Sequence, residues 1–321
     1  KRLFMKSVAM LAVSGIALTA AAGVVRAEYP EKPVTMVIPL GAGGSHDLIA
    51  RVITSIIPAY LGQPMIVRLT PGAGGQKGTQ EVANSEPDGY TILFTHNYID
   101  MLQQYVETLP DKPLEDFAPI ARVNYAPAAI VVRADSPYAT FGELVADAKA
   151  RPGALNLGHS GNWGAFFVPA AQIMKKLDFT MNMIPYQGGG PAMQALLSGD
   201  SDMTMSFPSG TAELLKAGKI RVLATAGKER FYEGVPTFEE VGIDGDIGFM
   251  HRAVVVPTGT PPEAIAALEK AFSELMADPT FTKLMGALDE DIHFMNGAEY
   301  GALRVEQAAA YEDLVKSLTS Q

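Results

Sequence analysis

The sequence has 321 residues and contains no cysteine. This absence excludes disulfides, thiolate metal ligands and cysteine nucleophiles, so the fold must depend on a sizeable hydrophobic core. Tryptophan occurs once, at Trp163, and none of the five histidines pairs with another at the spacing of metal ligands. We therefore expect no metal, no cofactor and no catalytic residue.

Basic residues are also scarce, with 25 lysines and arginines against 35 aspartates and glutamates. Four of the basic residues lie within the first 27 positions, so the remaining chain has 21 against 35, a net charge of −14. This negative balance argues against nucleic acid and anionic membranes as partners. An anionic ligand would have to be held by local dipoles, against the field of the whole protein.

Residues 1–27 have the pattern of a secretory signal peptide. Three basic residues among the first six precede an apolar run from Val8 to Val25, and small residues precede a cleavage site expected after Ala27. An uncleaved membrane anchor is the alternative, but the run is rich in alanine and glycine and only marginally long enough to span. Since no cysteine can carry a lipid, we expect the exported protein in solution in the bacterial periplasm.

The most informative stretch runs from Val34 to Asp47. The apolar residues 34–38 predict a buried strand, and periodic apolar residues predict a helix from Asp47 to about Pro58 with Ser45 as its N-cap. Between them lies a first glycine loop, residues 41–44. A strand, a glycine loop and a helix N-terminus together present free backbone N–H groups and a positive dipole end to an anion. The alternative is an ordinary tight turn without a ligand.

Three more glycine loops have the same construction, at residues 72–78, 158–164 and 187–191. The alternation of strands and helices predicts a parallel sheet with helices on both faces, in which such loops gather at the carboxyl ends of the strands. Helices alone follow Pro261 and are predicted to cover an existing domain. The nucleotide signatures are missing, because His46 replaces the third glycine of a dinucleotide loop and no Gly-Lys-Ser/Thr occurs.

Enzymatic patterns are weak. Ser45, His46 and Asp47 are triad residue types, but neighbours in sequence cannot form the relay geometry. The stretch around Ser160 resembles a nucleophile elbow, but Asn162 stands where its second glycine should be. A secreted hydrolase is therefore the least favoured of three functional classes, behind a transport receptor and a receptor that presents its ligand to a membrane sensor.

Seven short motifs resemble those of the extracytoplasmic solute receptors of tripartite tricarboxylate transporters, also called Bug receptors, over nearly the whole chain after residue 27. They are Tyr29-Pro30-Glu31-Lys32-Pro33, Gly43-Gly44-x-x-Asp47-x-x-Ala50-Arg51, Pro71-Gly72-Ala73-Gly74-Gly75, Pro87-Asp88-Gly89-Tyr90-Thr91, Tyr186-x-Gly188-Gly189-Gly190-Pro191-Ala192, Gly218-Lys219-x-Arg221 and Pro257-x-Gly259-Thr260-Pro261-Pro262. Each motif is weak alone, but their order and spacing are specific.

This resemblance implies an α/β periplasmic binding protein of type II, a Venus flytrap, in which each lobe is a mixed, mostly parallel sheet flanked by helices. Residues 28–127 and 250–321 would form lobe 1 and residues 128–249 lobe 2, with hinge crossings at Ala128–Val132 and Arg252–Val256. It further implies a monomer that passes a small organic carboxylate to membrane transporter subunits. The first and third loops would grip the carboxylate with backbone groups and ordered water.

The ligand-binding residues expected on this basis lie on cleft-facing loops. They are Gly43, Gly44, Ser45, His46, Asp47, Thr95, His96, His159, Ser160, Gly161, Asn162, Trp163, Tyr186, Gly188 and Gly189. Trp163 and His46 are unusual choices for the family, and on this interpretation they face each other across the cleft. An aromatic wall opposite an imidazole suits a planar carboxylate or a short dicarboxylate rather than citrate.

Overall fold

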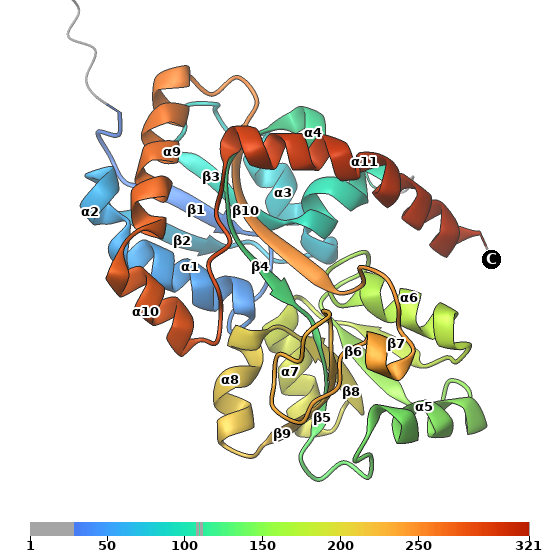
Figure 1. The fold of residues 1–321 in the computed structure, drawn as a ribbon. Coiled ribbons are helices and arrows are strands. Elements are labelled where there is room, and N and C mark those ends of the chain that lie inside the picture. The colour runs from blue at the N-terminus through green and yellow to red at the C-terminus, as the bar shows by residue number, and fades with distance from the viewer. Residues whose placement is uncertain (1–28, 107–108, 110–111, 321) are drawn as a thin grey trace, which may run out of the picture.

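The computed structural model describes residues 29–106, 109 and 112–320 (Figure 1). The expected signal peptide and its cleavage site lie outside these residues. None of the helices in the described part of the chain has the length and apolar character that crossing a membrane requires.

Two open sheets form the centres of two lobes, one above the other in Figure 1. The first sheet has the order β11-β4-β10-β3-β1-β2 and the second the order β7-β6-β8-β5-β9. The strands of the first are β1 (Val34–Ile38), β2 (Met65–Leu69), β3 (Thr91–His96), β4 (Phe117–Pro127), β10 (Phe249–Pro257) and β11 (Met295–Asn296); those of the second are β5 (Ala129–Arg133), β6 (Asn156–His159), β7 (Asn182–Pro185), β8 (Met203–Ser206) and β9 (Ile220–Thr225).

Helices flank both sheets. Those of the first sheet are α1 (Ser45–Ile56), α2 (Pro58–Leu61), α3 (Gln76–Ala83), α4 (Pro113–Asp116), α9 (Pro262–Met276), α10 (Pro279–Ala287) and α11 (Gly297–Thr319), and those of the second are α5 (Phe141–Ala150), α6 (Phe167–Leu177), α7 (Gly189–Ser198) and α8 (Pro208–Lys216). Short turns of other helix types are η1 (Ala73–Gly75), η2 (Tyr98–Leu102), η3 (Gln103–Tyr105) and η4 (Glu239–Val241). The predicted α/β class with two helix-flanked mixed sheets is confirmed, but the sheets are not mostly parallel: among the described strands, four pairs are parallel and five antiparallel.

The strands that link the two lobes are antiparallel to their neighbours. β1 pairs in parallel with β2 and β3, whereas β10 runs antiparallel to both β3 and β4. β4 and β10 lie side by side and extend toward the second lobe (Figure 1). The chain leaves the first sheet at Pro127, enters the second at Ala129 and returns through Phe249. In the described part of the chain, β4 and β10 are therefore the strands along which the backbone passes between the sheets.

Each lobe has its own hydrophobic core. In the first lobe, Met36 and Phe94 of the sheet pack with Ile53 of α1 and Phe272 of α9, all fully buried. A second cluster surrounds the other sheet and includes Leu157 and Phe207. The last helix, α11, contributes Tyr300 to a cluster with first-sheet residues and Val315 to the second cluster. This helix thus packs against the first sheet and also reaches the second cluster. The expectation of helices alone after Pro261 is wrong, because the short strand β11 pairs with β4 there.

One local prediction is wrong. Gly44, not Ser45, is the N-cap of α1, and Ser45 is the first helical residue. The reason is that Asp47 in the first turn turns back on the loop, where its Oδ2 accepts a hydrogen bond of 2.9 Å from the Gly43 N–H. The Asp47 carboxylate also pairs with Arg51, at 3.0 Å, one turn further along the helix.

Candidate functional site

The four glycine loops meet in pairs across the boundary between the lobes. The Gly41 N–H of the first loop donates to the Gln187 carbonyl of the fourth, at 2.6 Å. A Cβ atom on Gly190 would lie 2.1 Å from the Ala42 carbonyl oxygen, and one on Gly161 would lie 2.8 Å from the Gly74 Cα. Since real Cβ atoms essentially never come closer than 3.0 Å, these backbones can approach only because side chains are absent.

Two adjoining hollows lie beside these contacts, and Gly43 lines a separate third one with Ala42 and Gly190. The outer cleft has a volume of about 360 Å³ and is lined by Pro39, Leu40, Gly72, Ala73, Gly74, Gly75, Leu109, Ser160, Gly161, Asn162, Trp163, Pro185, Tyr186 and Gln187. The inner pocket has only about 20 Å³ and is lined by Leu40, Gly41, Gly44, Ser45, His46, His96, Ser160, Ala165, Phe166, Gly189, Phe207 and Met250. Leu40 and Ser160 line both hollows, so the two adjoin.

Most of the residues expected to bind ligand line one of these hollows. The outer cleft contains Ser160, Gly161, Asn162, Trp163 and Tyr186, and the inner pocket contains Gly44, Ser45, His46, His96, Ser160 and Gly189. Trp163 and His46 therefore line different hollows and do not form the opposed walls of a single one. Both the first and the third loop reach the inner pocket, and their joint grip on a carboxylate stays a prediction.

The other five expected residues line neither hollow. The Gly43 N–H is already bound to Asp47. The Thr95 carbonyl accepts a hydrogen bond from His46, and the His159 ring packs against Phe167 with 5.2 Å between centroids. Gly188 lies against the backbone of the first loop, because a Cβ there would come within 2.8 Å of the Gly41 nitrogen.

The apolar wall of the inner pocket was not among the residues predicted from the sequence. Phe207 is the N-cap of α8, directly after β8, and Met250 lies on β10. Phe207 occupies the same strand-to-helix position as the glycine loops, between β8 and α8. That position was the only available signal in the sequence, since a buried phenylalanine is otherwise typical of any core. Phe166 belongs to the core of the second lobe and also lines the pocket.

Two helix N-termini from different lobes converge on the inner pocket. The N-caps of α1 and α7 are Gly44 and Gly188, and neither helix has a side-chain cap. A Cβ on Gly44 would lie 3.0 Å from the Gly190 nitrogen, so the two helix starts are in contact. The positive ends of both helix dipoles therefore point to one place, which favours an anion there.

The two pocket histidines are buried and neutral. Burial lowers the pKa of His46 well below its usual value, and the neighbouring His96 and Arg252 lower it further. Burial and then Arg252 lower the pKa of His96 to about 3. The two rings lie edge to face, with 5.2 Å between centroids. Neutral imidazoles can donate and accept hydrogen bonds but bring no charge to a ligand.

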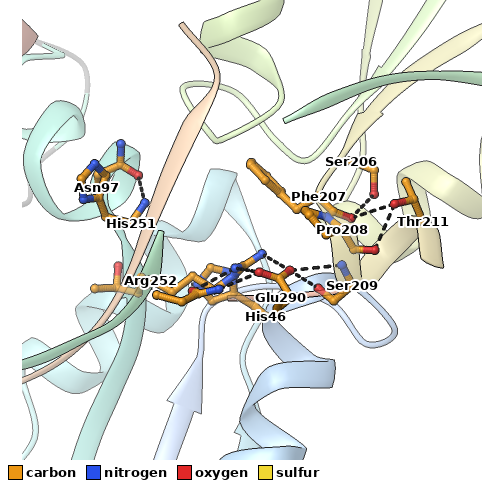
Figure 2. A network of polar contacts seen from close by, with 12 residues as sticks. His46, Asn97, Ser206, Phe207, Pro208, Ser209, Thr211, His251, Arg252 and Glu290 are labelled. Atoms are coloured by element: carbon orange, nitrogen blue, oxygen red, sulfur yellow. Dashed lines mark hydrogen bonds and ion pairs between the residues drawn. The ribbon is translucent and has the colours of Figure 1, made fainter. Parts of the chain in front are cut away.

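A buried ion pair beside the pocket joins the lobes (Figure 2). Arg252 of β10 and Glu290 are both fully buried and bind through two contacts of 2.9 and 3.2 Å, and Asn124 of β4 hydrogen-bonds both. Glu290 also accepts from the Ser209 N–H at 3.1 Å and from its hydroxyl at 2.5 Å. Ser209 lies in the first turn of α8, so a first-lobe carboxylate caps a second-lobe helix.

This pair leaves no free positive charge for a ligand in the hollows. Burial lowers the pKa of Arg252, and the Glu290 carboxylate opposes that shift. None of the described residues that line the outer cleft or the inner pocket is lysine or arginine. The available groups are backbone N–H groups, hydroxyls, the amides of Asn162 and Gln187, the Trp163 indole and neutral imidazoles, a set that suits a ligand of low charge.

Comparison with known proteins identifies the family. The family model for the tripartite tricarboxylate transporter family receptor matches residues 49–319. Protein BugT of Bordetella pertussis is 32% identical over 287 residues, which cover 87% of this chain and 87% of that protein. Among solved structures, the periplasmic binding protein BugD has a TM-score of 0.86 at 29% identity, over 90% of this chain and 98% of that one.

A further solved structure contains a ligand. MatC from Rhodopseudomonas palustris with bound malate has a TM-score of 0.83 at 26% identity, over 89% of this chain and all of that one. The family match covers far more than half of the sequence, and the structural matches agree with it in fold. The chain belongs to the receptors of the tripartite tricarboxylate transporter family.

Proposed function

We propose that this receptor works in the periplasm, binds a small organic carboxylate between its lobes and delivers it to a membrane transporter of the tripartite tricarboxylate type. The observation that carries the proposal is the convergence of two uncapped helix N-termini, α1 and α7, on a pocket between the lobes. Several neutral donors can together bind a carboxylate even where no cation is present. MatC, a relative of similar fold, has malate bound.

The mechanism is closure of two lobes around the ligand. We place residues 28–127 and 250–321 in lobe 1 and residues 128–249 in lobe 2, since β4 and β10 are the strands that lead from one sheet to the other. A ligand that touches both lobes stabilises the arrangement in which their loops meet. The protein binds and releases the acid without transforming it, and the form delivered to the periplasm begins at Glu28.

The test is identification of the bound acid. Mass spectrometry of protein purified without refolding should reveal a retained carboxylate, and calorimetric titration with malate, succinate, nicotinate, terephthalate and citrate should show binding of at least one. Uptake of that acid should be lost when the gene is deleted and return when it is restored. If the purified protein retains no acid and none of the five acids gives heat of binding, carboxylate binding is refuted. If uptake is unaffected by the deletion, the transport role is refuted.

A further inference from the structure

The inner pocket has room for one group of about the size of a water molecule, so a carboxylate attracted by the two helix N-termini would lie at its junction with the outer cleft, beside Leu40 and Ser160. Its volume is about 20 Å³, and a single water needs roughly 10–15 Å³ measured in this way. The outer cleft adjoins it and can hold the body of a ligand. The chemistry of the pocket walls then decides which small group enters.

His46 presents an acceptor to that group. Its Nε2 lies 3.0 Å from the Thr95 carbonyl oxygen. A carbonyl can only accept, so Nε2 must have the proton, and in a neutral ring Nδ1 then has a free lone pair. No group in the described part of the chain hydrogen-bonds to this Nδ1 in the structure. It is the one polar ring atom that His46 can offer to a group in the pocket.

His96 supplies an independent observation that points to a ligand. Its side chain is 1% exposed and lines the inner pocket, yet Nδ1 is buried without a hydrogen-bond partner. His96 lies directly opposite Arg252 in the sheet, where that positive charge favours the neutral ring. A neutral imidazole has one donor and one acceptor, so His96 can donate to a ligand oxygen while His46 accepts.

From this arrangement we infer that His46 selects a carboxylate with a hydroxyl group next to it, whose O–H donates to His46 Nδ1 in the inner pocket. The inference rests on the proposed function and names the substrate class of the same site. An ammonium group on the ligand could also donate to His46, but the positive ends of α1 and α7 and the nearby Arg252 disfavour a positive charge there. The apolar walls, Phe166, Phe207 and Met250, favour a single uncharged donor.

Pairs of acids that differ by one hydroxyl test the inference by calorimetry. We would titrate lactate against propionate, malate against succinate, and mandelate against phenylacetate. A ligand without the hydroxyl leaves a buried acceptor unpaired, so the hydroxy acid of a pair that binds should bind roughly 5- to 150-fold more tightly. Equal affinities within the pairs overturn the inference alone, since a bound water would then occupy the pocket. Tighter binding of alanine than of lactate also overturns it.

Two variants locate the effect. His46→Phe keeps a ring but removes the acceptor, so the ratio within each pair should fall to about one. His251→Phe is the control, because His251 is also a buried histidine and lines neither hollow; its ratio should be that of the wild type. A His46→Phe variant that retains the full ratio overturns the assignment. Binding of nicotinate or terephthalate with failure of all six acids overturns this inference alone. Failure of every acid tested, with none retained by the purified protein, overturns it together with the proposed function.

A spectroscopic measurement does not depend on any variant folding. Long-range ¹H–¹⁵N spectra of protein labelled in its histidines distinguish the two neutral tautomers from the imidazolium. His46 should be the Nε2-protonated tautomer both in the free protein and in the complex with the tightest-binding acid of the six. Appearance of a proton on His46 Nδ1 in the complex would overturn the inference, since this nitrogen would then donate to the carboxylate instead of accepting from a hydroxyl.

Discussion

Gly190→Ala should weaken ligand binding without unfolding either lobe. Gly190 is the second residue of α7, at a backbone conformation that other residues adopt freely, so alanine suits the helix itself. The obstacle lies in the other lobe. The added Cβ would be 2.1 Å from the Ala42 carbonyl oxygen and 2.8 Å from the Gly44 nitrogen. The loops must therefore move apart by at least about 0.9 Å before the closest contact reaches 3.0 Å.

The size of the effect follows from the cost of overpacking. An added methyl group in a close-packed contact typically costs about 1–3 kcal/mol. This cost applies only when the lobes are in contact, and it includes loosening the hydrogen bond between the Gly41 N–H and the Gln187 carbonyl. Because ligand binding requires that contact in the proposed mechanism, the dissociation constant should rise roughly 5- to 150-fold.

Gly142→Ala is the matched control. Gly142 is also the second residue of a second-lobe helix, α5, but a Cβ there has only the Thr140 hydroxyl oxygen within 4 Å, at 3.9 Å. Calorimetry with the tightest-binding acid should show weakened binding for Gly190→Ala and normal binding for the control, and both free variants should unfold cooperatively in urea. Small-angle scattering at saturating ligand should give a larger radius of gyration for Gly190→Ala. Equal affinities of the two variants would refute the argument.

Three further predictions concern other parts of the structure. Trp163→Ala removes the one indole of the outer cleft and should weaken the binding free energy of the acid by about 1–3 kcal/mol. In the wild type, binding of the same acid should change the tryptophan fluorescence. An unchanged affinity of the variant would place the ligand elsewhere. Ser209→Ala removes a hydroxyl donor to buried Glu290 and should lower the free energy of unfolding in urea by about 1.5–3 kcal/mol. Burial and then Arg122 lower the pKa of His251 to about 3, so the unfolded state binds its proton first as the pH falls through about 6.5. His251 thus lowers stability by about 2 kcal/mol between pH 7.5 and pH 5, and His251→Gln should reduce the pH dependence of unfolding by that amount.

The secondary structure was largely predictable because its signals are local. Helices α5 and α9 have such signals at their N-termini. In α5, Thr140 and Glu143 form a capping box, and in α9 a proline occupies the first turn. Hydrophobic periodicity gave the middle of each element, and these residues gave its ends. The N-cap of α1 was predicted wrongly because Ser45 is a residue type that favours this position. The contact of Asp47 with the Gly43 N–H, which lies within the loop, is not apparent from the sequence.

The candidate site was only partly predictable because its contacts join distant residues. The glycine loops indicated a binding site at the ends of the strands. Which loop contacts which other loop does not follow from the sequence of either. The ion pair between Arg252 and Glu290 and the hydrogen bond to Ser209 could not be predicted either, since no motif in the sequence links these three residues. Burial of these groups in one network is a property of the assembled lobes.

The role of the glycines in the structure differs from the role that the sequence suggested. The sequence suggested that glycine loops supply N–H groups to an anion, and the family resemblance assigned the grip to the first and third loops. In the structure, Gly43 is bound to Asp47, and Gly161, Gly188 and Gly190 lie against the backbone of the other lobe. Their main physical role is therefore to let two lobes touch without side chains between them. Selection of the ligand then falls to the few side chains at the edge of those contacts, with His46 and His96 in the inner pocket and Trp163 in the outer cleft.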